Sequence, residues 1–384
     1  MVQQNSTPMS MKRIVTITFM GHFANDGLVL MLPLLIPYVA RDFALSYSQI
    51  GLFGGSLVLT LGVGQVFTGY ISDFSKVKWP FITLGLIILG LSLFAMSFCS
   101  SYHCLIMCNL IAGLGASFYH PCGVALLAKS MKDRIKGKIL GIHGVGGCLG
   151  ILVYPVLAGI ILSRSDWRHV LLYLPLTGIV AATPFFLTRE EKSYTKRTTK
   201  TRLIHKESVL LIILLGCIAM FFRGFVTFLP VRLEEIGYSA ASVAAVVTIF
   251  YGTGVIGELS AGFLSDMYSK NKILFAALLS ASFLVVILFK SVWVLIFPLG
   301  FVSYVVWVPV LAVYVEGVPE AWYGTALGLL QGLAGLMAFL SPMAMGVIAE
   351  RSGISSSFLF LAAVALIGAL LSLKVRSTDL QKLS

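Results

Sequence analysis

The chain has 384 residues, of which 58% are hydrophobic and 11% charged, and its net charge is +12. Water-soluble domains usually have about a quarter of their residues charged, so this composition excludes an ordinary soluble protein. In a bilayer, a chain of this length leaves room for about twelve spanning helices of ~20 residues with short connections.

Twelve long apolar runs, separated by short polar breaks, predict an all-α membrane protein with twelve transmembrane helices. In the first half we expect helices at Ile14–Val39, Gln49–Tyr70, Pro80–Phe98, Cys104–Leu127, Ile139–Leu162 and Val170–Thr188. In the second half we expect them at Ser208–Pro230, Ala240–Phe263, Ile273–Phe289, Val292–Val315, Tyr323–Val347 and Ser356–Leu373. An even number of spans places both termini on one side of the membrane.

The longest polar break lies in the middle of the chain. It divides a predicted N-terminal six-helix bundle (1–188) from a C-terminal six-helix bundle (208–384) through a basic linker (189–207). With the N-terminus in the cytosol, 21 of the 28 basic residues fall on the cytosolic side and 6 on the other. The positive-inside rule therefore predicts a multi-pass protein of the cell membrane with both termini cytosolic. Basic residues placed in this way face lipid headgroups, which argues against nucleic acid as a partner.

The two halves repeat one another. Gly69 and Asp73, at the end of the predicted second helix, return as Gly262 and Asp266 at the end of the eighth, 193 positions later. The same offset relates four further residues to identical ones: Pro37 to Pro230, Ser46 to Ser239, Gly64 to Gly257 and Ser72 to Ser265. This repetition predicts a six-helix unit duplicated in parallel, as in transporters whose halves rock about a central site.

The six cysteines all lie in or beside apolar runs, without a paired Cys-x-x-Cys motif. We therefore expect buried, free cysteines, with no disulfide bond, no metal site and no cofactor. The chain also lacks the HExxH and GxSxG motifs that would bring a metal or a nucleophile into the membrane, so we do not expect an enzyme.

The repeated Gly-x-x-x-Asp sequences resemble the loop signature of the major facilitator superfamily, which follows helices two and eight in that family. The resemblance implies a fold of two parallel six-helix repeats and transport by alternating access. A helix-end aspartate can dock onto the end of a neighbouring helix and hold the halves in one state. We interpret Gly69, Asp73, Gly262 and Asp266 as a conformational latch, with a plain solvated loop as the alternative.

Gly141, Gly150, Pro155 and Gly159 in predicted helix five are similar to the antiporter motif of drug/proton exchangers. Glycines at this spacing let helices approach closely, and Pro155 bends the helix. The segment is thus expected to seal or flex between the halves. Generic helix packing is an equally good explanation of the same residues.

A narrower resemblance, to the fosmidomycin-resistance type of efflux protein, covers most of the first half. It is carried by His22-x-x-Asn25-Asp26 in helix one, Tyr119-His120-Pro121 in helix four and Gly144-Val-Gly-Gly147 in helix five. Cys122 stands where members of that type have an acidic residue. The resemblance implies efflux and makes Asn25, Tyr119 and His120 candidates for substrate binding. Because Pro121 removes a backbone donor, helix four is also expected to kink beside His120.

Four ionisable residues lie deep in the predicted spans: His22 and Asp26 in helix one, His120 in helix four and Arg223 in helix seven. In the major facilitator fold these three helices line the central cavity. Charges inside a membrane are expensive and normally face a cavity or one another, which makes these residues functional candidates. His22, Asn25 and Asp26 are spaced i, i+3 and i+4, so they share one helix face.

We interpret Asp26 as the proton-coupling group, with His22 modulating it; a hydrogen bond that only packs helices is the alternative. Arg223 is expected to bind an anionic substrate group or to neutralise Asp26 when the cavity is empty. Glu258, nearer the cytosol, is expected to be a latch partner. Trp307 is a candidate aromatic wall of the cavity, with core packing as the alternative.

These residues favour a secondary active transporter that exports a small amphiphilic or anionic compound in exchange for protons. Uptake of an organic anion by proton symport is the alternative, because Arg223, His22 and His120 would serve it equally well. A receptor or sensor with the same fold is more remote. We expect a monomer whose partners are the lipid bilayer, a small-molecule substrate and protons.

Overall fold

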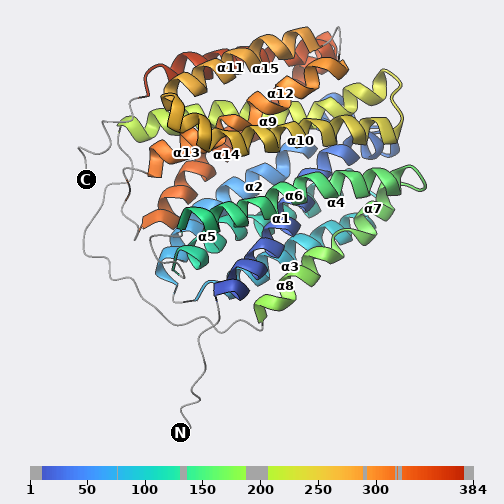
Figure 1. Ribbon diagram of the computed structural model, residues 1–384. Coiled ribbons are helices and arrows are strands. Elements are labelled where there is room, and N and C mark those ends of the chain that lie inside the picture. The colour runs from blue at the N-terminus through green and yellow to red at the C-terminus, as the bar shows by residue number, and fades with distance from the viewer. Residues whose placement is uncertain are drawn as a thin grey trace.

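The computed structural model describes residues 11–75, 77–129, 136–186, 206–288, 292–315, 318 and 322–375. Within these ranges the chain is helical, without strands, and twelve segments are long and apolar enough to cross a membrane. Figure 1 shows the helices side by side, with α1–α8 in one bundle and α9–α15 in another. α1 begins and α15 ends at the same end of the molecule, which we call the terminal end, as opposed to the far end. The predicted all-α fold with twelve spans is confirmed.

The helices of the two bundles follow one another with short connections. The first bundle contains α1 (Met11–Asp42), α2 (Tyr47–Phe74), α3 (Trp79–Met96), α4 (Tyr102–Ala116), α5 (Tyr119–Lys129), α6 (Lys136–Leu162), α7 (Trp167–Tyr173) and α8 (Leu176–Phe186). The second contains α9 (Lys206–Glu235), α10 (Ala240–Met267), α11 (Lys270–Ile287), α12 (Val292–Val305), α13 (Trp307–Val315), α14 (Tyr323–Ser352) and α15 (Ile354–Ser372). The predicted linker 189–207 lies almost wholly outside the described residues, so the domain limits at 188 and 208 stay a prediction.

The sequence repeat recurs in the way that equivalent helices begin. Ser46 precedes α2, and its side chain accepts a hydrogen bond from the backbone N–H of Gln49. Ser239, its equivalent, precedes α10 and accepts from the backbone N–H of Ser242. Each serine satisfies one of the free N–H groups of a helix start, so the duplicated residue has kept the same structural task in both halves.

Three predicted spans are each built from two shorter helices, and a proline lies in or just after each break. Pro121 and Pro309 are the third residues of α5 and α13, and Pro175 directly precedes α8. The kink expected beside His120 is confirmed, since α4 ends at residue 116 and α5 begins at 119. The Ser117 carbonyl at this break accepts a hydrogen bond from Thr68 Oγ1 at 2.9 Å. A side chain of α2 thus replaces the backbone donor that the proline lacks.

The two bundles meet along α2 and α14 through glycines. A Cβ atom on Gly51 would lie 2.3 Å from the carbonyl oxygen of Pro342, and one on Gly69 would lie 2.3 Å from that of Gly324. Neither contact leaves room for a side chain, so the two backbones lie as close as small residues permit. The contacts lie at opposite ends of α2, which means that this seam runs from the far end to the terminal end.

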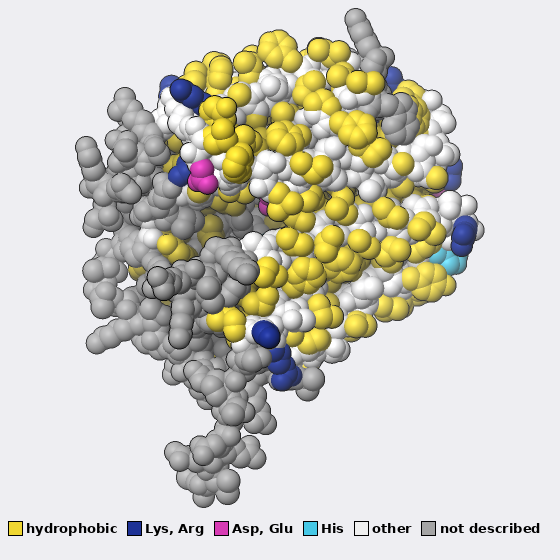
Figure 2. All heavy atoms as spheres, viewed as in Figure 1, with side chains coloured by type: hydrophobic (Ala, Val, Ile, Leu, Met, Phe, Trp, Pro, Cys, Tyr) yellow, Lys and Arg dark blue, Asp and Glu magenta, His cyan; other side chains and the backbone are white. Residues whose placement is uncertain are grey.

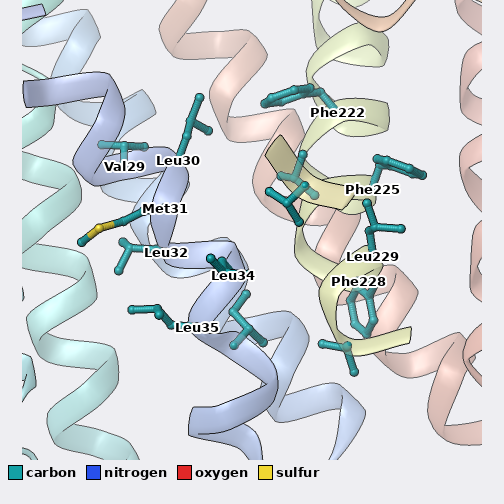
Figure 3. Close-up of a cluster of buried hydrophobic side chains, with 14 of the residues drawn as sticks. Val29, Leu30, Met31, Leu32, Leu34, Leu35, Phe222, Phe225, Phe228 and Leu229 are labelled. Atoms are coloured by element: carbon teal, nitrogen blue, oxygen red, sulfur yellow. The ribbon is translucent and has the colours of Figure 1, made fainter. Parts of the chain in front are cut away.

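Apolar side chains form both the core and the outer surface. Figure 3 shows aliphatic residues of α1, such as Leu30 and Leu34, beside Phe222 and Phe225 of α9 in the largest buried cluster. On the visible face, hydrophobic side chains cover the middle and Lys and Arg gather at the two ends (Figure 2). Exposed side chains of this kind, such as Phe263 with 68% exposure, suit contact with lipid.

The expectation that no cysteines are paired is wrong for one pair. Cys99 and Cys104 form a disulfide across the connection between α3 and α4, with Cα atoms 5.5 Å apart. The expectation treated these cysteines as parts of apolar spans, whereas the chain leaves α3 after Met96 and enters α4 at Tyr102. That short connection at the far end brings the two thiols within bonding range.

Candidate functional site: a polar cavity between the two bundles

A cavity of about 320 Å³ lies between the two bundles. Helices α1, α2, α5 and α6 line it from the first half, and α9, α10, α13 and α14 are among those that line it from the second. Six of the residues singled out from the sequence for substrate or proton binding lie in its wall: His22, Asn25, Asp26, His120, Arg223 and Trp307. The structure therefore brings together residues that are up to 285 positions apart in the sequence.

Asp26 is the centre of a polar cluster in the first half. Its Oδ2 lies 3.0 Å from His22 Nε2, and its Oδ1 lies 3.1 Å from His120 Nε2. Asn25 Nδ2 also donates to Oδ1, at 2.9 Å. The side chain of Asp26 keeps 22% exposure, toward the cavity that it lines. The i, i+3, i+4 spacing on α1 thus places three polar side chains on one face, as predicted, and α5 adds the fourth.

The orientation of the His22 ring fixes where its hydrogens lie. Nδ1 lies 2.9 Å from the backbone carbonyl oxygen of His143, which can only accept, so Nδ1 carries a hydrogen. Nε2 then faces Asp26 Oδ2 across 3.0 Å, and two bare lone pairs would repel at that distance. A proton therefore lies between these two atoms, either on the imidazole or on the carboxyl group. The pair thus has the geometry to share a proton, and both residues line the cavity.

Glycines of α6 allow this pair to form. A Cβ atom on Gly147 would lie 2.6 Å from His22 Nε2 and 3.0 Å from Asp26 Oδ2. Cβ atoms on Gly146 and Gly150 would lie 2.6 and 2.2 Å from the carbonyl oxygens of Phe19 and Phe23. The glycines thus let α6 pack directly on α1 beside the cluster.

The antiporter-like residues of α6 contact different neighbours. A Cβ atom on Gly159 would lie 2.4 Å from Ala244 Cβ of α10, so this residue packs against the other half. At Gly141, the part of the chain that the structure describes leaves open space within 4 Å. Pro155 lies inside α6, which continues past it. Gly150 and Gly159 therefore have a packing role, and the exchange role of the motif stays a prediction.

Tyr119, expected to bind substrate, lies outside the cavity wall. Its side chain is 1% exposed, and its hydroxyl donates to the Thr18 carbonyl. Its ring stacks on that of His22 at 5.5 Å between centroids, and the His143 ring stacks on His22 at 4.4 Å. The expected position of Tyr119 is therefore corrected. Its ring packs on the His22 ring and does not line the cavity.

Arg223 enters the cavity from α9. The guanidinium carbon lies 5.8 Å from the centre of the Phe222 ring, and no described residue forms an ion pair or a hydrogen bond with the side chain. Asp26, a suggested partner, is instead held by two histidines. Trp307 and Tyr304 line the same side and meet the Phe222 ring edge-on at 6.2 and 5.2 Å. An unpaired guanidinium next to aromatic rings has the chemistry that an anion with an apolar body would need for binding.

Glu258 also lies in the cavity wall and not beside the predicted latch. Its carboxylate oxygen is 4.0 Å from Cys148 Sγ of α6, and it faces the His22–Asp26 pair closely enough for electrostatic interaction. The expectation of a latch partner near Asp266 is therefore corrected. The sequence position alone did not show that Glu258 turns inward from α10.

At the terminal end, Asp73 docks onto the first turn of α14. Its carboxylate accepts hydrogen bonds from the backbone N–H groups of Gly324 and Thr325 at 3.0 and 2.7 Å, and from Thr325 Oγ1 at 2.6 Å. Gly69 packs against the same turn. This is the docking that the repeated motif predicts: a negative charge on a helix start.

The second Gly-x-x-x-Asp motif, at Gly262 and Asp266, shows no such docking among the described residues. Asp266 is exposed at the end of α10, and a Cβ atom on Gly262 would meet open space within 4 Å among the described residues. The helix equivalent to α14 is α6, whose start follows residues 130–135, outside the described ranges. The structure therefore gives a contact for one copy only.

The cavity contains polar residues that the sequence analysis missed: Gln65, Cys148 and Gln331. Gln65 is 4% exposed. A polar amide within an apolar run was the sequence signal that could have identified it. Atoms of His22, Asp26 and His120 lie within 4.8 Å of one another, a spacing that a metal ion also accepts. Hydrogen bonds among the three side chains already account for their positions, so the geometry does not require an ion.

Comparison with known proteins agrees with this architecture. The family model of the Major Facilitator Superfamily matches residues 17–342 and 234–383. The cis,cis-muconate transport protein of Acinetobacter baylyi is 23% identical over 373 residues, which cover 90% of this chain and 89% of that protein. The fosmidomycin resistance protein of Escherichia coli is 21% identical over 373 residues, which cover 91% and 90%. The crystal structure of a D-xylose-proton symporter superposes with a TM-score of 0.78 at 15% identity, over 97% of this chain and 99% of that one.

The fold and its central cavity define a multi-pass membrane transport protein. The chain belongs to the Major Facilitator Superfamily. Its similarity to the fosmidomycin resistance protein agrees with the resemblance found in the sequence motifs.

Proposed function

We propose that the chain exports a small anionic or amphiphilic compound from the cytosol in exchange for protons. It would do so from the cytoplasmic membrane, with its terminal end in the cytosol. The observation that carries the proposal is that a proton-holding His22–Asp26 pair and an unpaired Arg223 line one cavity from opposite halves. A substrate site and a proton site in one cavity of about 320 Å³ must influence each other electrostatically.

The direction of coupling follows from the chemistry of the substrate. A compound with an anionic group for Arg223 and an N–H or O–H donor for Asp26 binds best after the proton has left, because the bare carboxylate then accepts the donor. Proton and substrate exclude each other in this case, which gives antiport. An anion without a donor binds best while the proton is present, which gives symport.

The names of two relatives supply suitable test compounds. Fosmidomycin carries a phosphonate and an O–H donor, whereas ionised cis,cis-muconate carries two carboxylates and no donor. Export of the first compound is the proposed function. Uptake of an anion such as the second is the alternative function, which the same Arg223 supports.

Transport by purified protein in liposomes tests the proposal. We expect labelled fosmidomycin to accumulate in liposomes whose interior is acidic, and cis,cis-muconate not to accumulate under that gradient. Accumulation of either compound only when the outside is acidic would favour symport. Failure of both compounds, and of a wider panel of organic anions, to show counterflow would point to a receptor or sensor.

A further inference from the structure

Three cysteines meet at the far end of the first bundle, away from the cavity. Cys99 and Cys104 form the disulfide, and Cys108 Sγ lies 3.7 Å from Cys99 Sγ. The three sulfur atoms all lie within 4.8 Å of one another. We propose that these residues form a thiol–disulfide exchange site, in which Cys108 is the attacking thiol and small disulfides and thiols are the reagents.

The exchange reaction balances without an external oxidant. The Cys108 thiolate attacks Cys99 Sγ, so that a Cys99–Cys108 bond forms while the Cys99–Cys104 bond breaks. Cys104 leaves as a thiolate and takes up the proton that Cys108 has lost. A distance of 3.7 Å is already van der Waals contact between two sulfur atoms, so the attack needs little movement.

Cys99 is held as a fixed pivot for both disulfides. Arg168 Nη1 of α7 donates to the carbonyl oxygens of Ser97 and Cys99, at 2.7 and 2.8 Å. The two alternative partners, Cys104 and Cys108, are one turn apart on α4 and therefore share a face of that helix. Rotation of the Cys99 side chain is enough to change from one partner to the other.

The position of Cys104 at the start of α4 stabilises its thiolate, the leaving group of the exchange. Cys104 lies in the first turn of α4, and its backbone N–H donates to Ser101 Oγ, which caps the helix. The positive end of the helix dipole stabilises a thiolate there. Cys104 and Cys108 are both partly exposed, whereas Cys99 is buried at 2% exposure. The two exchanging thiols are therefore more accessible to a small reagent than the pivot is.

Peptide mapping of the full chain tests this proposal independently of transport. Chymotrypsin cuts after Tyr102 and Leu105, so it separates the three cysteines into different peptides. After incubation with oxidised glutathione and blocking of free thiols, we expect glutathione on Cys104 as well as on Cys108 in the wild type. Glutathione on Cys108 alone, or on neither, would overturn the proposal.

The Cys104→Ser variant gives a second test of the same exchange. In a mixed glutathione buffer, we expect most molecules of this variant to contain a Cys99–Cys108 disulfide. The matched control is Cys217→Ser, which removes a buried free cysteine of α9 and should leave the wild-type pattern unchanged. Free Cys99 and Cys108 in Cys104→Ser, in a buffer that keeps the wild-type disulfide intact, would contradict the proposal.

Discussion

At the residue scale, the proposed exchange of protons depends on one carboxyl group with three neighbouring donors. Asp26 faces two imidazoles and an amide, and the ring of His22 is oriented by the His143 carbonyl. These hydrogen bonds hold the His22 ring and the Asp26 carboxyl group in fixed positions. In the proposed mechanism, a substrate that competes for Asp26 Oδ2 displaces the proton while the backbone stays in place.

The Asp26→Asn variant separates proton coupling from substrate binding. The new amide can donate to His22 Nε2, so the geometry is kept but no proton can be released. We expect accumulation driven by a pH gradient to vanish while exchange of labelled for unlabelled substrate continues. Both quantities can be measured in the same liposomes. Uphill transport with an unchanged pH profile would place the coupling group elsewhere, with Arg223 and Glu258 as the next candidates.

The Gly147→Ala variant tests the packing that supports the cluster. Its added methyl group would lie 2.6 Å from His22 Nε2, and overpacking of this kind costs about 1–3 kcal/mol. We expect transport to slow roughly tenfold and its pH profile to shift, because the hydrogen bond to Asp26 is strained. Gly252→Ala on α10, where the added methyl group would lie 3.4 Å from Leu152 Cδ2 in ordinary contact, is the control and should be close to the wild type. An equal loss of transport rate in both variants would mean that any disturbed helix packing slows transport, not this contact in particular.

The sequence predicted part of this site for clear physical reasons. The i, i+3, i+4 spacing fixes the shared face of His22, Asn25 and Asp26 whatever the tertiary structure. Two other positions, those of Tyr119 and Glu258, depend on how helices distant in sequence rotate against one another. Periodicity within one apolar helix does not determine that rotation when nearly every face is hydrophobic.

At the element scale, α2 and α14 form the closest contact between the bundles. Asp73 places a full negative charge on the three donors of the first turn of α14, where the helix dipole favours it. Glycines along the seam let the two backbones touch. The carboxylate is therefore well placed to stabilise one state of the transport cycle.

The Asp73→Asn variant should shift the balance between states and leave substrate affinity in each state unchanged. Hydrogen bonds to a charged group contribute about 1.5–3 kcal/mol, so we expect the docked state to lose roughly a factor of ten in population. Spin labels at the C-terminal end of α2 and the N-terminal end of α14 would report this shift as a longer distance between the two labels. Asp166→Asn, an exposed aspartate that caps α7 within the first bundle, is the comparison variant and should change that distance less. Identical shifts in both variants would argue against docking as the cause.

At the scale of the whole molecule, the two bundles also touch at the far end. Tyr47 donates to Glu235 Oε1 at 2.5 Å, and the backbone N–H of Ser48 donates to Glu350 Oε2 at 3.1 Å. These contacts lie at the opposite end of α2 from Asp73. Alternating access requires the two sets to open in turn, since a cavity open at both ends would leak.

Twelve spans were predictable because about 20 apolar residues are needed to cross a bilayer, and the polar breaks mark the ends. The Ser46 and Ser239 caps show that the internal repeat reflects a shared local structure. The disulfide was not predictable in the same way. Whether Cys99 meets Cys104 depends on where one helix ends and the next begins, and hydropathy does not fix such limits to the residue.

Orientation in the membrane is the last prediction, and the distribution of charge carries it. The predicted topology assigns most of the basic residues to the side of the terminal end, so this end should face the cytosol and the disulfide at the far end should face an oxidising exterior. We expect Thr198→Cys in the linker to react with a membrane-impermeant maleimide only after cells are opened. Ser163→Cys, in the connection after α6, should react in intact cells. The unmodified chain gives the background from Cys108, a partly exposed free cysteine. Labelling of Thr198→Cys in intact cells, with protection of Ser163→Cys, would reverse the proposed orientation and with it the direction of export.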